Sequence, residues 1–298
     1  MIRFFVVCLF ECLWCLSNLI IKPRGVTYQK GLRRELANRN IDAAAYHNRK
    51  KKSFRVKSDY GYQLSCELVE CPENSPESPG KKIAIFCHGF GYAKYGCIKY
   101  TDFFLRLGYS VLMYDHRNHG ESGKAHTSMG FYERYDLLRV VDWCYQNYGP
   151  DCKVITHGES MGAATVLLHL GIDSRVKCAI ADCAYSDLTE LLKHQLKQYY
   201  HLPSWLIPVV GHLTYLRAGF RYRQVSPIKI VSEVETPVLF IHGKIDNMVP
   251  CRMSKEMYRA KKNKKAIYLV AKARHAASYI TNREGYERRV EDFLNKYV

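Results

Sequence analysis

The chain has 298 residues, of which 47% are hydrophobic, so it can bury one substantial core. Its net charge of +17 is uneven: residues 22–57 hold twelve cations against two anions, which is ten of the seventeen net positive charges. Elsewhere no Cys/His finger, RNP-like string or alternation of basic and aromatic residues accompanies the charge, which argues against a nucleic-acid-binding protein.

The basic segment follows an apolar run, residues 4–21, which Glu11 and Asn18 interrupt. A helix of about 20 apolar residues spans a bilayer, so three interpretations compete: a signal anchor, a cleaved signal peptide, and an amphipathic or buried helix. The run is long and no small-x-small site closes it, which argues against cleavage. We therefore expect a single-pass membrane protein with a transmembrane signal anchor at residues 1–21 and a basic juxtamembrane linker at residues 22–53.

Two further features bear on the compartment. Positive charge beside a membrane segment tends to stay in the cytoplasm, and here it lies on the C-terminal side, so we expect the main domain to face the cytoplasm. The twelve cysteines are scattered, several of them in apolar runs, which is typical of buried thiols in a reducing compartment. The close group Cys8, Cys12 and Cys15 has no nearby His, so we expect no metal site.

From residue 54 to 298 the apolar pattern predicts an α/β domain. Residues 53–58 and 63–69 alternate apolar and polar side chains about a turn, which is typical of an antiparallel hairpin. Beyond them, continuous apolar runs predict strands buried on both faces, and the helical stretches between them predict parallel crossovers. These runs are Lys82–Cys87, Ser110–Tyr114, Lys153–Thr156, Val176–Ala181, Val238–Ile241 and Ala266–Val270. The expected fold is a doubly wound, mostly parallel sheet with an N-terminal antiparallel hairpin.

One stretch, at about residues 187–234, is too long for a simple crossover. We expect it to form a helical cap above the sheet. Its aromatic and apolar side chains suggest an apolar substrate pocket, although they would serve equally well as the cap's own small core. These residues are Tyr199, Tyr200, Trp205, Leu206 and Ile207.

A glycine-flanked serine follows the third of these predicted strands. In Gly158-Glu-Ser160-Met-Gly162 the serine stands between that strand and the apolar helix that begins at Ala163. This is the context of a nucleophile elbow, in which a strained turn presents the serine and the glycines let neighbouring backbone approach. The pattern without that context would indicate only a glycine-rich turn.

A serine nucleophile needs a base, and the base needs an orienting carboxylate. His275 follows the last predicted strand, which would bring it to the sheet edge near the serine. Asp246 lies just beyond the strand before it, and a turn-forming role is its structural alternative. Asp187, after an earlier strand, is a second candidate for the acid. The order serine, acid, histidine is the one expected for this kind of fold.

An acyl-transfer site also needs two N–H donors for the oxyanion. Met161 follows the serine and would supply the first. Phe90, in His88-Gly89-Phe90-Gly91, would supply the second, because the glycines on both sides let its amide turn inward. A tight turn with no ligand remains the alternative for this loop.

From about residue 54 to the C-terminus, the ordered blocks resemble the α/β-hydrolase superfamily. The blocks are His-Gly-Phe-Gly, Asp-His-Arg-x-His-Gly-x-Ser, Gly-Glu-Ser-Met-Gly, His-Gly-x-x-Asp-x-x-Val-Pro and a late His. They are most similar to N-terminally anchored bacterial hydrolases related to serine aminopeptidase-like and monoacylglycerol-lipase-like proteins. The resemblance implies the triad Ser160, Asp246 and His275 with oxyanion donors Phe90 and Met161.

These features together predict a serine hydrolase that needs no cofactor and cleaves small-molecule carboxylic esters, lipid-like or with a small acyl group. Two alternatives stay open, because one fold serves many functions. One is an amidase or aminopeptidase-like hydrolase, and the other is a catalytically silent binding protein with the same fold.

Overall fold

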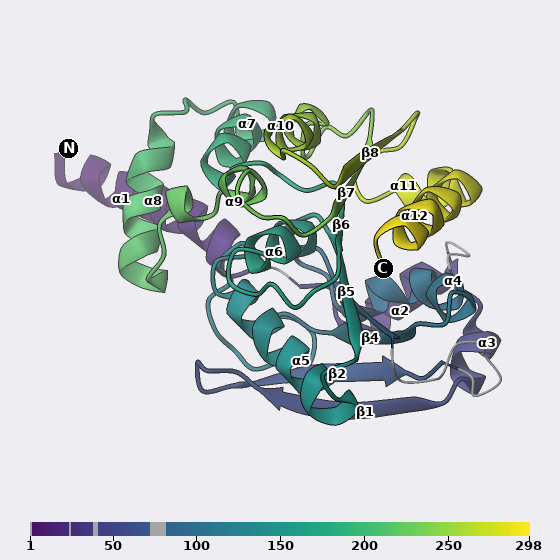
Figure 1. Ribbon diagram of the computed structural model, residues 1–298. Helices are drawn as coiled ribbons and strands as arrows, with labels where there is room; N and C mark the ends of the chain where they lie inside the picture. Colours follow the sequence, from purple (N-terminus) through teal and green to yellow (C-terminus); the bar gives the residue numbers. More distant parts are fainter. Residues whose placement is uncertain (1, 24, 38–40, 72–81) are drawn as a thin grey trace.

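The computed structural model describes residues 2–23, 25–37, 41–71 and 82–298, without the side chains of residues 2–9, 28 and 43 (Figure 1). At its centre is an eight-stranded sheet in the order β1-β2-β4-β3-β5-β6-β7-β8. The strands are β1 (Lys51–Lys57), β2 (Gln63–Val69), β3 (Lys82–Cys87), β4 (Ser110–Tyr114), β5 (Lys153–Glu159), β6 (Ala179–Asp182), β7 (Val238–Gly243) and β8 (Lys265–Val270).

Strand pairing follows the predicted pattern. β1 and β2 form the antiparallel hairpin and β2 pairs antiparallel with β4, whereas the pairs from β4 through β3 to β8 are parallel. The carboxyl ends of the parallel strands therefore meet at one edge of the sheet. The predicted doubly wound, mostly parallel sheet with an N-terminal hairpin is confirmed.

Helices cover both faces of the sheet (Figure 1). One face carries α5 (Glu133–Tyr148), α6 (Met161–His169), α9 (Pro227–Val231) and α10 (Arg252–Ala260). The other carries η1 (Lys94–Tyr100), α4 (Thr101–Arg106), α11 (Ser278–Thr281) and α12 (Arg283–Tyr297).

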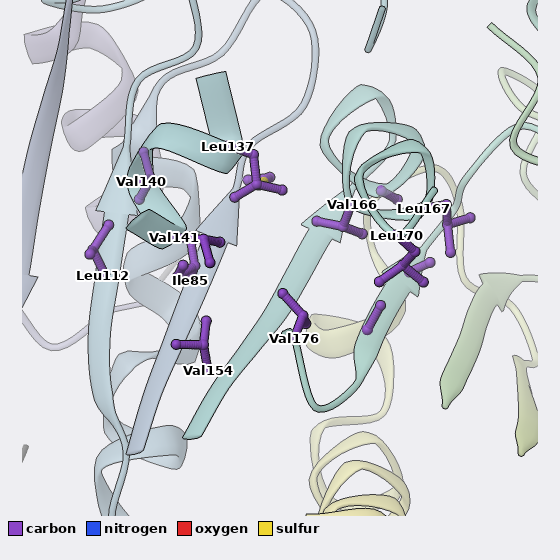
Figure 2. Close-up of a cluster of buried hydrophobic side chains, with 14 of the residues drawn as sticks. Ile85, Leu112, Leu137, Val140, Val141, Val154, Val166, Leu167, Leu170 and Val176 are labelled. Carbon is purple, nitrogen blue, oxygen red and sulfur yellow. The ribbon is translucent and has the colours of Figure 1, made fainter. Parts of the chain in front are cut away.

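The core between the sheet and α5 and α6 shows why these segments pair (Figure 2). Ile85 and Val154 of the strands belong to one hydrophobic cluster with Val141 of α5 and Val166 of α6, and all four are fully buried. Burying one such side chain stabilises the fold by about 1.5–3 kcal/mol. The packing of the sheet against α5 and α6 thus explains both sequence patterns, the strands that are apolar throughout and the helices that carry an apolar stripe.

The chain between β6 and β7 contains the expected helices of the cap: α7 (Leu188–Tyr200), α8 (Leu206–Ala218), η2 (Tyr222–Gln224) and α9. Leu188, Leu191 and Leu192 of α7 share a hydrophobic cluster with Ile207 and Val210 of α8. The cap is therefore a packed unit on the side of the sheet that carries α6.

The N-terminal apolar run forms α1 (Ile2–Ile21), which lies against α8 of the cap (Figure 1). Within the described part of the chain, no helix is long and apolar enough to cross a membrane. The prediction of a transmembrane anchor at residues 1–21 is therefore wrong. The predicted single-pass membrane localisation with a cytoplasmic domain depended on that anchor and is therefore wrong as well.

The contacts of α1 give the physical reason for the correction. The hydroxyls of Ser17 and Thr214 lie 3.1 Å apart in a hydrogen bond. The Arg217 guanidinium lies 3.6 Å from the centroid of the Trp14 ring and donates to Asn18 Oδ1. An apolar helix that carries Ser17 and Asn18 thus finds polar partners on the cap, which a lipid chain would not offer.

Residues 22–53, expected to form a basic linker, contain α2 (Tyr28–Ala37), α3 (Ala43–Asn48) and the start of β1. Some of the cations pair with carboxylates of the fold: Arg49 with Asp102 at 2.9 Å, and Lys50 with Glu70 at 2.7 Å. Part of the local charge is therefore neutralised within the protein.

The contact between α1 and the cap is testable. Arg217→Ala removes the stacking on Trp14 and the hydrogen bond to Asn18, so we expect the free energy of unfolding to fall by about 1–2 kcal/mol. Urea denaturation measures that change, and limited trypsin digestion should cut faster within residues 22–34. Arg223→Ala, at an exposed position beyond α8, is the control. Equal behaviour of the two variants would contradict this docking.

Candidate active site

Ser160 stands between β5 and α6 at the carboxyl edge of the sheet. Its backbone adopts φ 55° and ψ −116°, a conformation that non-glycine residues rarely adopt. A Cβ at Gly162 would lie 2.0 Å from the carbonyl oxygen of Cys87, and one at Gly158 would lie 2.3 Å from the carbonyl carbon of Gly162. Both flanking glycines are therefore required by the close approach of backbone to backbone.

His275 links Ser160 to Asp246. Its Nε2 lies 2.9 Å from Ser160 Oγ and its Nδ1 lies 2.7 Å from Asp246 Oδ2. A carboxylate can only accept, so Nδ1 carries the proton and Nε2 is left to accept the Ser160 hydroxyl proton. The structure brings together the three residues that the sequence nominated from separate loops.

Asp246 is held from two sides. Its Oδ1 accepts the amides of Met248 and Val249, both at 2.9 Å, so it also forms the turn that was its alternative role. Its Oδ2 receives His275 and lies 3.3 Å from Nε2 of the buried His242. Burial alone would raise the pKa of Asp246, but the hydrogen bonds from His242 and His275 outweigh it and hold the pKa well below its usual range. The carboxylate is therefore ionised at neutral pH.

Asp187, the other candidate for the acid, has a different role. It is the N-cap of α7, where its Oδ1 accepts the amides of Thr189 at 2.9 Å and Glu190 at 3.3 Å. Capping of this kind satisfies amides that have no partner within the helix.

The Phe90 loop, residues 88–91, approaches Ser160 from the end of β3. A Cβ on Gly89 would lie 3.6 Å from Ser160 Cβ, and Phe90 and Met161 both belong to or pack against the hydrophobic cluster beside the serine. Met161 is the first residue of α6, so its N–H has no acceptor within the helix. The Met161 backbone and the Phe90 loop thus approach Ser160 from two different elements.

Two buried histidines hold this loop. His88 Nδ1 donates to the Gly89 carbonyl at 2.8 Å while its Nε2 accepts the His116 amide at 2.9 Å. His119 Nε2 accepts the Gly91 amide at 3.0 Å. Burial lowers the pKa of both His88 and His119, so both rings stay neutral and can accept these bonds.

A cavity of about 610 Å³ opens beside Ser160 and His275. Its apolar lining comes from the end of α1, from α7 and α11, and from the loops after β3, β4, β6, β7 and β8: Leu19, Ile20, Phe90, Met129, Tyr185, Leu191, Leu192, Met248, Val249, Ala276, Ala277 and Ile280. A volume of this size suits a ligand of drug-like dimensions.

The pocket residues expected from the sequence are not among those that line this cavity. Tyr199, Tyr200 and Trp205 are about half or more exposed, and Leu206 is buried in the cap's own core. The reason is the amphipathic character of α7, whose apolar stripe faces inward two turns before Tyr199. The spacing of Leu188, Leu191 and Leu192 was the signal that could have found the lining.

Three side chains near the site are close enough together to be considered as metal ligands. Cys183, Asp246 and His275 each offer a ligand atom within 4.8 Å of the others. Burial raises the pKa of Cys183 well above its usual value, so the thiol keeps its proton and is a poor ligand. Both nitrogens of His275 already face Asp246 and Ser160.

Comparison with known proteins places the chain in a family. Residues 84–208 match the family model described as the alpha/beta hydrolase fold. The chain is similar to the uncharacterised protein YqkD of Bacillus subtilis, with 36% identity over 94% of this chain and 90% of that protein. The chain belongs to the α/β-hydrolase superfamily.

Solved structures agree with this assignment of the fold. The Pyrococcus furiosus esterase Pf2001 superposes with a TM-score of 0.70 at 23% identity, covering 93% of this chain and 99% of that one. Est1E of Butyrivibrio proteoclasticus, solved with ferulic acid bound, superposes with a TM-score of 0.64 at 18% identity, covering 82% and 98%. The predicted α/β-hydrolase fold is confirmed.

This α/β-hydrolase carries a buried ion pair beside its elbow, at the wall of the cavity, which the sequence did not indicate. Glu159 Oε1 accepts Lys99 Nζ and the Tyr100 hydroxyl, both at 2.6 Å. Burial alone would lower the pKa of Lys99, but the Glu159 carboxylate raises it above its usual value. Lys99 therefore stays charged in the interior, and its burial depends on Glu159.

Glu159→Gln should destabilise the hydrolase strongly, because it leaves the buried Lys99 cation without its counter-ion. Breaking one side of a buried pair costs about 3–5 kcal/mol, whereas removing both charges is often close to neutral. We expect the double variant Glu159→Gln, Lys99→Met to recover most of the loss in thermal unfolding. Losses that simply add in the double variant would contradict the pairing.

Asp182, at the end of β6, is a second buried acid beside the elbow. Its main-chain oxygen accepts the Ser160 amide at 2.9 Å and its Oδ1 accepts Ser278 Oγ at 2.9 Å. Within the described chain its Oδ2 has no hydrogen-bond partner. Burial raises the pKa of Asp182 to about 6.

Asp182→Asn should therefore change how stability depends on pH. An acid whose pKa is raised in the fold favours folding fully below about pH 4, and this contribution is lost as the pH rises to about 6, because the unfolded chain ionises first. At about 1.4 kcal/mol per pKa unit, the wild type should lose about 3 kcal/mol more than the variant over that interval. Urea unfolding at a series of pH values measures this, and parallel curves would refute it.

Proposed function

We propose that this protein is a serine hydrolase that cleaves carboxylic esters through an acyl-enzyme on Ser160. The observation that carries the proposal is the hydrogen-bonded chain from Asp246 through His275 to Ser160 at the wall of a largely apolar cavity. In this reading Ser160 is the nucleophile, His275 the base and Asp246 the group that orients His275.

In the first half of the reaction, His275 Nε2 takes the Ser160 hydroxyl proton while Oγ forms a bond to the ester carbonyl carbon. The negative charge that develops on the carbonyl oxygen is stabilised by the amides of Phe90 and Met161. The tetrahedral intermediate then collapses, the carbon–alkoxide bond breaks, and His275 gives its proton to the leaving alcohol. Ionised Asp246 stabilises the imidazolium that forms between the two steps.

In the second half, water takes the place of the alcohol. His275 removes one proton from the water as its oxygen bonds to the acyl carbon, and the second intermediate collapses to release the carboxylic acid. Ser160 Oγ recovers its proton from His275. The cycle uses only groups of this chain and water.

The charges around the cavity favour an ester over an aminopeptidase substrate. An aminopeptidase needs a carboxylate to hold the substrate's ammonium group. Among the described residues, the acids that line the cavity are engaged instead: Glu159 with Lys99, and Glu35 with the Tyr92 hydroxyl. The structural neighbour Pf2001 is itself described as an esterase, which also favours an ester substrate.

The nucleophile and its partners can be tested together. Ser160→Ala should abolish labelling by an ethoxy fluorophosphonate probe, and Asp246→Asn should lower kcat for 4-nitrophenyl butyrate by about 10⁴-fold. Asp187→Asn makes the same change at a helix cap where Asn serves as well, so it should keep the wild-type rate. A folded wild type that takes no label would refute the enzyme and support a binding protein, and faster cleavage of acyl anilides than of matched esters would identify an amidase.

A further inference from the structure

The segment before the sheet crosses the active-site edge of the molecule. We define the N-terminal arm as residues 17–23 and 25–35. It begins at the cap, where Ser17 bonds Thr214, and continues beside the loop after β4, where the Thr127 amide donates to the Ile21 carbonyl at 3.0 Å. It then reaches the Phe90 loop, where the Val26 amide donates to the Gly91 carbonyl at 3.0 Å. The arm is therefore fixed at three points around the cavity.

The arm contributes to both halves of the cavity. Leu19 and Ile20 line the apolar half, and Ile20 belongs to the same hydrophobic cluster as Met129, Leu191 and Leu192. Farther along, Arg34 and Glu35 line the polar half, which is completed by Tyr92, Lys99 and Glu159. Ser160 follows Glu159 of the polar half and precedes Met161, which belongs to the apolar cluster, so it stands between the two halves.

The position of His275 assigns the halves to the two parts of an ester. His275 must give its proton to the leaving alcohol, so the alcohol lies on the side of this residue. The chain that follows His275 leads through Ala276 and Ala277, which line the cavity, to Ser278, whose hydroxyl bonds Asp182 behind Glu159. The alcohol therefore leaves through the polar half, and the acyl chain extends the other way, under the cap.

We propose that the N-terminal arm is a specificity-determining wall, and that Leu19 and Ile20 limit the length of the acyl chain that Ser160 accepts. The substrate class is an ester of an apolar acyl chain with a small polar alcohol. This inference rests on the proposed function. Leu19 is 45% exposed and Ile20 only 8%, so Leu19 stands at the rim of the apolar half and Ile20 deeper within it.

The experiment uses probes that react with a serine nucleophile whatever its natural substrate. Ethyl alkylphosphonofluoridates with a phosphorus-linked methyl or decyl chain replace the acyl group, and the rate of labelling is measured for each protein. In Leu19→Trp the indole narrows the apolar half, so we expect labelling by the decyl probe to slow by about tenfold or more and labelling by the methyl probe to change less than about twofold. Ile20→Ala deepens the same half, so a hexadecyl probe should react faster than with the wild type.

Leu216→Trp is the matched control, because Leu216 is 67% exposed on α8 and does not line the cavity. It should keep the wild-type ratio of decyl to methyl rates. A ratio unchanged in Leu19→Trp and Ile20→Ala, or equal slowing with both probes, would overturn the role of the arm and leave the serine hydrolase intact. No labelling of the wild type by any probe would instead refute the proposed function, and the inference with it.

Discussion

Helix α6 begins where the backbone of β3 ends, at a separation that only glycine permits. Any side chain at Gly162 would overlap the carbonyl of Cys87, and one at Gly158 would overlap the start of the helix. This close approach brings the Met161 amide, the Phe90 loop and the Ser160 hydroxyl to one point. It also holds Ser160 at positive φ, since the amide of Ser160 is bonded to Asp182 and its carbonyl to Ala164. The strain in the elbow is thus offset by hydrogen bonds to the neighbouring strand and to the helix.

Histidines serve two purposes at this edge, and burial separates them. His88 and His119 are neutral supports that fix the Phe90 loop, and His242 braces the turn that contains Asp246 through Val249 and Ser254. His275, which joins Asp246 to the Ser160 hydroxyl, keeps 18% exposure of its side chain, whereas His242 is fully buried between Asp246 and Ser254. A proton acceptor that must also release its proton needs access to substrate, whereas a supporting imidazole is more useful when it stays neutral.

The sequence predicts well those parts of the structure in which a pattern of residues is compatible with one physical arrangement only. Continuous apolar runs predicted β3 and β4 to the residue, because a strand buried on both faces leaves no other arrangement. The order of Ser160, Asp246 and His275 along the chain predicted a triad, and these three side chains do contact one another. The apolar run of α1 had two meanings, since an apolar helix can lie in lipid or pack on another helix, and here α1 packs on α8 with Ser17, Ile20 and Ile21 buried. Likewise, the aromatic residues at the end of α7 suggest a substrate pocket from the sequence alone, because apolar character predicts that a side chain is buried but does not identify what it packs against.

The docking of α1 therefore matters to the site as well as to the fold. Gly91 receives a hydrogen bond from the Val26 amide on one side of its peptide and donates one to His119 on the other. Phe90, the proposed oxyanion donor, precedes this residue, so the direction of its amide depends on both contacts. One contact comes from the loop after β4, through His119, and the other from the N-terminal arm, which Trp14 and Ser17 fasten to the cap. The cap, the N-terminal arm and the Phe90 loop thus contact one another in sequence around Ser160. The apolar segment that resembles a membrane anchor is the part that completes the wall of the active site.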